Sequence, residues 1–163
     1  MEKFLEQLKI KLLELQILLF NSKLTVPKYT PDKIIIHHGA GKLNFDEVNN
    51  YHKQKWGFKS YLGYYIGYQY FIERDGKIYQ GRDDGEEGAH TIGQNKTSIG
   101  ICLQGNGEEY NFTDFKYSSL KNLVKEKCQQ YNIDKEEIYG HRDFSSTACP
   151  SNRLYYYLTL LKQ

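Results

Sequence analysis

The feature that most limits the fold is an alternation, from residue 33 onward, of short apolar runs with longer segments of helical periodicity. Strands are expected at 33–38, 65–74, 77–82, 98–105 and 137–142, and helices at 44–56, 113–132 and 152–162. Asn44 and Glu47 have the spacing of a capping box at the start of the first helix, and Thr113 is the expected cap of the second. The Asp75-Gly76 pair between two of the strands is typical of a tight hairpin turn. Strands that alternate with helices, with one antiparallel hairpin among them, predict a single α/β domain. Its central mixed β-sheet would be flanked by helices.

The first 32 residues do not share this alternation. Leucines recur there at spacings of three and four, at Leu5, Leu8, Leu12, Leu15 and Leu19. This spacing is a heptad seam on an amphipathic helix, although it is shorter than the three to four heptads of a coiled coil. The helix is expected either to dock on the domain or to self-associate through residues 1–21. Two prolines within residues 21–33 indicate a linker, so the chain divides into 1–32, helix and linker, and 33–163, the domain.

Composition excludes several classes of protein. The formal net charge of the 163 residues is only +2 and the charges are interspersed, which argues against a nucleic-acid partner. No apolar run approaches the roughly 20 residues of a transmembrane helix. The first 21 residues carry scattered charges and no small-residue cleavage site, so we expect no signal peptide and synthesis in the cytoplasm. Three cysteines in a domain of this size are not a disulfide framework.

Histidines and one cysteine stand where strands are expected to end. His37 and His38 close the strand at 33–38, His141 closes the strand at 137–142, and Cys149 follows in a polar loop. Imidazole and thiolate are ligands that zinc prefers, and a site with three protein ligands leaves a fourth position open for chemistry. The residues therefore indicate a catalytic metal site that uses one of the two adjacent histidines. The alternative is that these histidines are packed or hydrogen-bonded residues without a metal.

Five motifs in order connect the chain to a known family. They are IIIHHGAG, GYQYFIERDGKIYQGR, GAHT, NKTSIGICLQG and GHRDFSSTACP. Together they span residues 33–153 and resemble the N-acetylmuramoyl-L-alanine amidases of the phage lysozyme and peptidoglycan-recognition-protein type. The resemblance implies one catalytic Zn²⁺ ion held by His37, His141 and Cys149.

The resemblance also implies roles for four further residues. Tyr68 and Thr147 are the expected catalytic residues, both stabilising the oxyanion of the tetrahedral intermediate. Phage-type members have a lysine where this chain has Thr147, so we expect a slower enzyme or a greater dependence on Tyr68. His38 and His90 are the candidate substrate contacts.

Three other features of the sequence carry expectations. Arg142 and Asp143 are expected to form a local ion pair, and His52 is expected to pack its helix on the sheet. The run GFKSYLGYYIGY at 57–68 is several residues longer than its family counterpart, so the cleft wall should differ there.

By this resemblance the chain hydrolyses the amide bond between N-acetylmuramic acid and L-alanine in peptidoglycan. A phage or prophage-type lysin that reaches the wall after holin-type release would fit the expected lack of a signal peptide. A non-catalytic peptidoglycan-binding protein is one alternative, but such relatives have lost the ligand cysteine. A cytosolic muropeptide-recycling amidase is the other, but those relatives tend to have aspartate in place of Cys149.

Overall fold

The computed structural model describes residues 2–24, 29–107 and 114–163. Its five strands are β1 (Lys33–His38), β2 (Tyr70–Ile72), β3 (Ile78–Gln80), β4 (Ser98–Leu103) and β5 (Ile138–Gly140). The α-helices are α1 (Glu2–Leu24), α2 (Phe45–Lys55), α3 (Asp114–Tyr131) and α4 (Asn152–Leu161). Two 3₁₀ turns, η1 (Lys135–Glu137) and η2 (His141–Asp143), flank β5.

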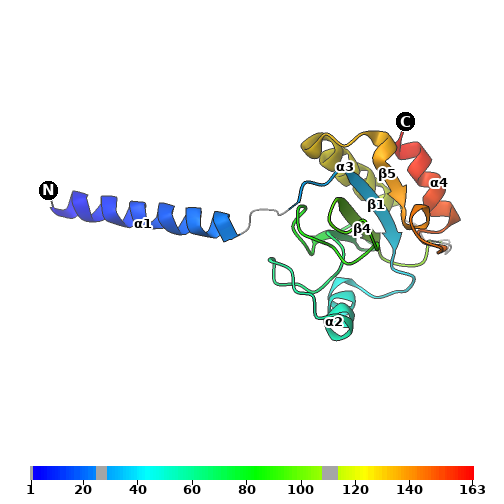
Figure 1. The fold of residues 1–163 in the computed structure, drawn as a ribbon, viewed down its shortest axis with the longest axis horizontal. Coiled ribbons are helices and arrows are strands. Elements are labelled where there is room, and N and C mark those ends of the chain that lie inside the picture. The colour runs from blue at the N-terminus through cyan, green and yellow to red at the C-terminus, as the bar shows by residue number, and fades with distance from the viewer. Residues whose placement is uncertain (1, 25–28, 108–113) are drawn as a thin grey trace.

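The strands form one mixed sheet in the order β3-β2-β4-β1-β5. β1 lies parallel to both of its neighbours, β4 and β5, and β2 is also parallel to β4. Only the β2–β3 pair is antiparallel, and its turn contains Gly76 at φ +87°. The expected α/β domain with a central mixed sheet and flanking helices is confirmed (Figure 1).

Each face of the sheet has its own core. The larger core joins β1, β2, β4 and β5 to α3 and α4, and from β1 it takes Ile34 and Ile36. The smaller core packs Phe45 and Val48 of α2 against Phe71 and Cys102. Because side chains alternate along a strand, His37 lies on the α2 face, opposite Ile36.

Helix α2 begins as the sequence predicts. The Asn44 side chain accepts from the Glu47 backbone N–H at 2.9 Å, and the Glu47 carboxylate accepts from the Asn44 N–H at 2.8 Å. This capping box satisfies donors that the first helical turn leaves unpaired. His52, near the end of α2, is buried as expected and accepts a 2.9 Å hydrogen bond from the Gly67 N–H through Nδ1.

Helix α1 lies apart from the domain (Figure 1). Every side chain described on it, from residue 5 to residue 17, is exposed, including Leu8, Leu12 and Leu15. The prediction that α1 docks on the domain is therefore wrong for residues 5–17, whose leucine side chains are all exposed. No helix among the described residues is long and apolar enough to span a bilayer. The linker prediction falls partly on residues 25–28, and the expected cap Thr113 also lies outside the described residues.

Candidate metal centre and active-site cleft

The three expected metal ligands converge at one edge of the sheet. His37 stands at the end of β1, His141 opens η2 directly after β5, and Cys149 lies in the loop before α4. β1 and β5 are adjacent parallel strands, so their carboxyl ends meet at the same edge. One ligand atom from each residue lies within 4.8 Å of the others. The His37 Nδ1 atom is 3.8 Å from the Cys149 sulfur, and the two imidazole centroids are 4.6 Å apart.

The electrostatics of this cluster suit a cation. Burial lowers the pKa of both His37 and His141, so each ring is neutral and offers a lone pair. Burial raises the pKa of the Cys149 thiol to about 11, while the His38 N–H, 3.4 Å from the sulfur, favours the thiolate. A bound cation would compensate the buried thiolate charge, because metal ligands must be deprotonated. Two neutral imidazoles and one sulfur therefore fit a divalent metal ion of intermediate softness.

The loop that carries Cys149 is held by the two charged residues after His141. The Arg142 Nη1 atom donates to the Asn152 side chain at 2.8 Å, and the Arg142 N–H donates to the Cys149 carbonyl at 2.9 Å. Asp143 accepts from the Gly140 N–H at 2.8 Å and from a tyrosine hydroxyl of α4 at 2.6 Å. The expected Arg142–Asp143 ion pair is wrong, because the Arg142 side chain binds Asn152 whereas the Asp143 carboxylate binds the end of β5 and helix α4.

A cleft of about 650 Å³ opens beside the metal cluster. Its lining residues are Trp56, Phe58, Tyr68, Ala89, His90, Thr91, Ile92, Asn95, His141 and Ser145. The Tyr68 ring lies 5.2 Å from the His37 ring. Burial and the nearby thiols of Cys102 and Cys149 raise the pKa of Tyr68 well above its usual value. Its phenol is therefore a neutral hydrogen-bond donor at the cleft surface.

Four of the predicted site residues are not among the residues that line the cleft: the candidate ligands His37 and Cys149, and also Thr147 and His38. Thr147 is exposed, and its hydroxyl accepts from the Cys149 N–H at 3.2 Å. The His38 ring accepts from the Gly107 N–H at 3.0 Å through Nδ1. The backbone N–H of His38, rather than its ring, contacts the metal cluster, because it lies 3.4 Å from the Cys149 sulfur.

His90 lies directly behind a candidate ligand. Its Nδ1 atom is 3.1 Å from the Nε2 atom of His37, and the two rings meet edge to face with centroids 5.0 Å apart. Burial, and after it the neighbouring His141, lowers the pKa of His90 to about 3, so the ring is neutral. The GAHT motif marked this residue, but no feature of the sequence indicated its contact with His37.

The lengthened wall segment, residues 57–68, is held by a buried ion pair that the sequence did not predict. Arg82 is fully buried and pairs with Glu86 at 3.2 Å. The same guanidinium donates to the carbonyls of Ile66 and Phe58 and stacks 4.3 Å from the Phe58 ring. The Glu86 carboxylate also accepts from the Ser60 hydroxyl at 2.8 Å. One buried arginine thus fixes both ends of the wall segment beside the cleft.

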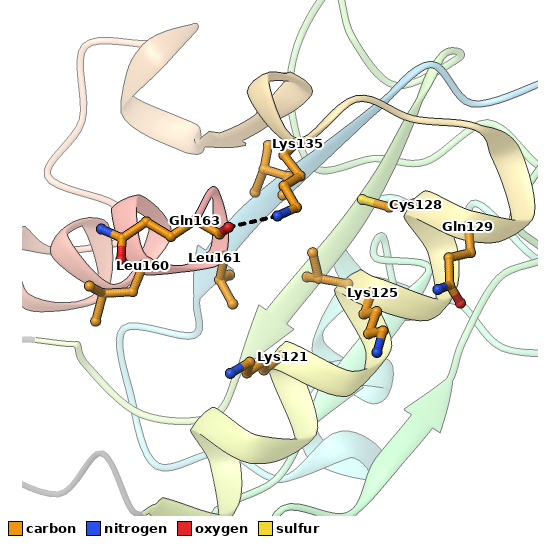
Figure 2. A pocket seen from close by; sticks show the side chains of 10 residues that line it. Lys121, Lys125, Cys128, Gln129, Lys135, Leu160, Leu161 and Gln163 are labelled. Atoms are coloured by element: carbon orange, nitrogen blue, oxygen red, sulfur yellow. Dashed lines mark hydrogen bonds between the residues drawn. The ribbon is translucent and has the colours of Figure 1, made fainter.

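A second cavity, of about 480 Å³, lies between α3 and α4 on the opposite face of the sheet (Figure 2). Three lysines, Lys121, Lys125 and Lys135, line it together with apolar side chains and the Cys128 thiol. Burial raises the pKa of that thiol, so it is a poor nucleophile. The metal cluster and Tyr68 lie on the other face, which makes the first cleft the candidate active site.

A candidate His/His/Cys metal site at the edge of a mixed sheet, beside an open cleft with a phenol donor, is an arrangement suited to metal-assisted hydrolysis. The sequence model of the Amidase_2 family, N-acetylmuramoyl-L-alanine amidase, matches residues 27–152. The chain belongs to this family and is a peptidoglycan amidase of the endolysin-like type.

Individual relatives agree with this assignment. The endolysin of Enterobacteria phage K11 is 34% identical over 128 residues, which cover 73% of this chain and 80% of the phage protein. The endolysin amidase LysCS from Clostridium intestinale URNW has a TM-score of 0.70 at 30% identity, covering 81% of this chain and 83% of that one. Drosophila PGRP-LB, in wild-type form, has a TM-score of 0.67 at 28% identity over 81% of this chain and 81% of its own.

Proposed function

We propose that this amidase uses a zinc ion held by His37, His141 and Cys149 to cleave the bond between N-acetylmuramic acid and L-alanine. The observation that carries the proposal is the convergence of the three donor atoms within 4.8 Å beside the cleft. Zinc in such a set supplies a Lewis acid that polarises a carbonyl and lowers the pKa of water. Hydrolysis consumes one water, leaves the lactyl carboxylate on the sugar and frees the amine of L-alanine.

The chain's own residues supply the remaining stabilisation. Tyr68 keeps its proton and lines the cleft, so its phenol donates a hydrogen bond to the oxygen on which negative charge develops. Thr147 has its hydroxyl oxygen anchored on the Cys149 N–H, which leaves the hydroxyl proton for a second such bond. His38 contributes through its backbone N–H, which holds the Cys149 sulfur.

The proposal is tested on purified peptidoglycan. We expect new L-alanine amino groups without new reducing ends, loss of this activity on chelation and recovery with zinc. Cys149→Ser should abolish the hydrolysis because it removes the sulfur ligand, whereas Cys128→Ser, on α3 away from the cleft, should retain it. Wall binding with no product in the zinc-loaded wild type would overturn the proposal in favour of a recognition protein.

We also propose that the enzyme is made in the cytoplasm and acts on the wall after holin-type release. The similarity to phage endolysins supports this route. Expression in bacteria with and without a membrane-permeabilising protein tests it. Lysis should require both proteins, and lysis by the amidase alone would contradict the proposal.

Self-association through residues 1–21 is part of the same proposal. Its support is the exposure of Leu5, Leu8, Leu12 and Leu15 on α1, which lies apart from the domain. Apolar side chains repeated at heptad spacing are stabilised when a second helix of the same kind covers them.

A further inference from the structure

A chain of hydrogen bonds runs from the candidate metal centre into the domain. His37 Nε2 lies 3.1 Å from His90 Nδ1, and His90 Nε2 lies 3.5 Å from the Ser98 hydroxyl oxygen. The Ser98 hydroxyl donates to the Gln94 carbonyl at 2.7 Å. This series of hydrogen bonds therefore ends on a backbone carbonyl, which can only accept a hydrogen bond.

That fixed end sets the direction of every bond in the chain. Because the Ser98 proton is committed to Gln94, the serine oxygen must accept from His90 Nε2–H. A neutral imidazole carries one N–H, so His90 Nδ1 has a lone pair and accepts a hydrogen bond from His37 Nε2–H. Nδ1 of His37 is left with its lone pair, and this is the atom 3.8 Å from the Cys149 sulfur.

The surroundings of His90 hold its ring in one place. A Cβ on either Gly88 or Gly100 would lie only 2.5 Å from the ring's Cδ2 atom, so the ring fills a slot that two glycines provide. The side-chain oxygen of Asn95 accepts from the backbone N–H groups of His90 and Thr91 at 2.9 and 2.8 Å. The Thr91 hydroxyl lies 3.1 Å from His90 Nδ1 and 3.3 Å from His37 Nε2.

We propose that His90 is a positioning residue that fixes the tautomer of His37, so that the Nδ1 lone pair faces the metal. The relay through Ser98 and the Gln94 carbonyl fixes the tautomer of His90 in turn. This inference rests on the proposed role of His37 as a metal ligand and replaces the substrate contact expected for His90. Histidine ligands in metal sites are generally oriented by such a partner on their second nitrogen.

Two substitutions separate the hydrogen bond from the packing. His90→Leu keeps side-chain volume but removes the acceptor, whereas His90→Asn loses volume but places an amide oxygen near the former Nδ1. We expect zinc affinity, measured by competition with a chromophoric chelator, to fall about 10- to 100-fold in His90→Leu. His90→Asn should stay within a few-fold of wild type. Thermal unfolding of the metal-free proteins shows whether each variant is folded.

Ser98→Ala tests the relay itself. It should weaken zinc binding by a few-fold when residue 90 is histidine and have no effect beside His90→Asn, because an amide has no tautomer to fix. Nitrogen-15 chemical shifts of His37 in the metal-free protein should report protonation at Nε2 in wild type. In His90→Leu they should report a mixture of tautomers.

Three results would overturn the inference. One is His90→Leu with wild-type zinc affinity and a wild-type His37 tautomer. Another is an equal loss in His90→Leu and His90→Asn, which would assign the effect to packing. The third is a change confined to the KM for muropeptide, which would make His90 a substrate contact. Zinc affinity is measured without substrate, so failure of the amidase proposal is distinguishable from failure of this one.

Discussion

At the scale of single residues, Tyr68 carries the sharpest prediction about catalysis. Its raised pKa keeps the phenol protonated, and it lines the cleft beside His37. Tyr68→Phe removes one oxyanion donor and should lower kcat about 10²- to 10³-fold. Zinc content and KM should change little, and Tyr156→Phe on the exposed face of α4 should behave as wild type. Steady-state kinetics on a soluble muropeptide measure the split, and unchanged kcat would remove Tyr68 from the mechanism.

His52 gives the folded state a pH dependence. Its pKa falls from 6.5 to about 4 because burial, then the charges of Lys55 and Arg82, disfavour the imidazolium. Between these two pH values the imidazole is protonated in the unfolded chain and neutral in the folded chain. The free energy of unfolding therefore decreases as pH falls from about 6.5 to about 4. His52 contributes at most about 3 kcal/mol to the free energy of unfolding, and this contribution is fully present above pH 6.5.

The matched variant for this prediction is His52→Asn. Its amide oxygen can still accept from the Gly67 N–H, the bond that His52 Nδ1 makes at 2.9 Å, but it cannot titrate. Urea unfolding of the metal-free protein at pH 7 and pH 4.5 should show a smaller drop in stability for the variant. Equal drops in both proteins would mean that His52 is not the group responsible.

The sequence predicts the three candidate ligands but not the partner of His37. The local pattern marks His141, Cys149 and one of the pair His37/His38, because ligand residue types end two strands and occupy one loop. The resemblance to the amidase family then selects His37. The His37–His90 contact joins positions 53 residues apart and depends on the slot between Gly88 and Gly100. Neither periodicity nor spacing encodes such a slot.

At the scale of elements, β4 supports the metal centre because Gly100 has no side chain and so leaves room for the His90 ring. Gly100→Ala would bring a methyl carbon to 2.5 Å from the His90 ring, which must then move. Overpacking of this kind costs about 1–3 kcal/mol of stability, and the displaced ring should also weaken zinc binding. Gly41→Ala, whose nearest neighbour is 3.9 Å away, is the control. Calorimetry and chelator competition on both variants measure the two effects, and wild-type values for Gly100→Ala would contradict the slot.

The elements follow the sequence where local pattern decides and depart from it where tertiary contacts do. β1 has the predicted limits, Lys33–His38, and α2 has the predicted capping box. The strand expected at 65–74 shrinks to Tyr70–Ile72, because the preceding backbone is drawn into other bonds. The Gly67 N–H donates to His52 and the Ile66 carbonyl accepts from Arg82. Apolar and aromatic residues there satisfied the strand pattern without forming a strand.

At the scale of the whole molecule, the candidate active site and the larger apolar core lie on opposite faces of the sheet. The α2 face carries His37, Tyr68 and the cleft, whereas the α3 and α4 face holds the larger apolar core. Helix α1 lies outside both layers (Figure 1). The heptad spacing predicted this helix, but spacing alone could not tell docking on the domain from self-association, because both would bury the same leucines.

Helix α1 has a second apolar seam as well as the leucine seam. Ile10, Leu13 and Ile17 repeat at spacings of three and four and are all exposed. At 100° per residue this seam lies roughly 150° around the helix from the seam of Leu8 and Leu12. A two-stranded coiled coil buries one seam of each helix and would leave the other in water. We therefore expect the full chain to form assemblies larger than a dimer.

Sedimentation equilibrium on paired variants tests this assembly. Leu8→Glu with Leu12→Glu disrupts the first seam, Leu13→Glu with Ile17→Glu disrupts the second, and Gln7→Glu adds a charge outside both. Each seam pair should reduce the assembly to a dimer or monomer, because like charges would be buried at the contact, while Gln7→Glu should not. An effect of the first pair alone would indicate a simple dimer. A wild-type monomer that partitions onto anionic phospholipid vesicles would instead assign α1 to a lipid surface, since apolar helices uncovered in solution can also be covered by lipid.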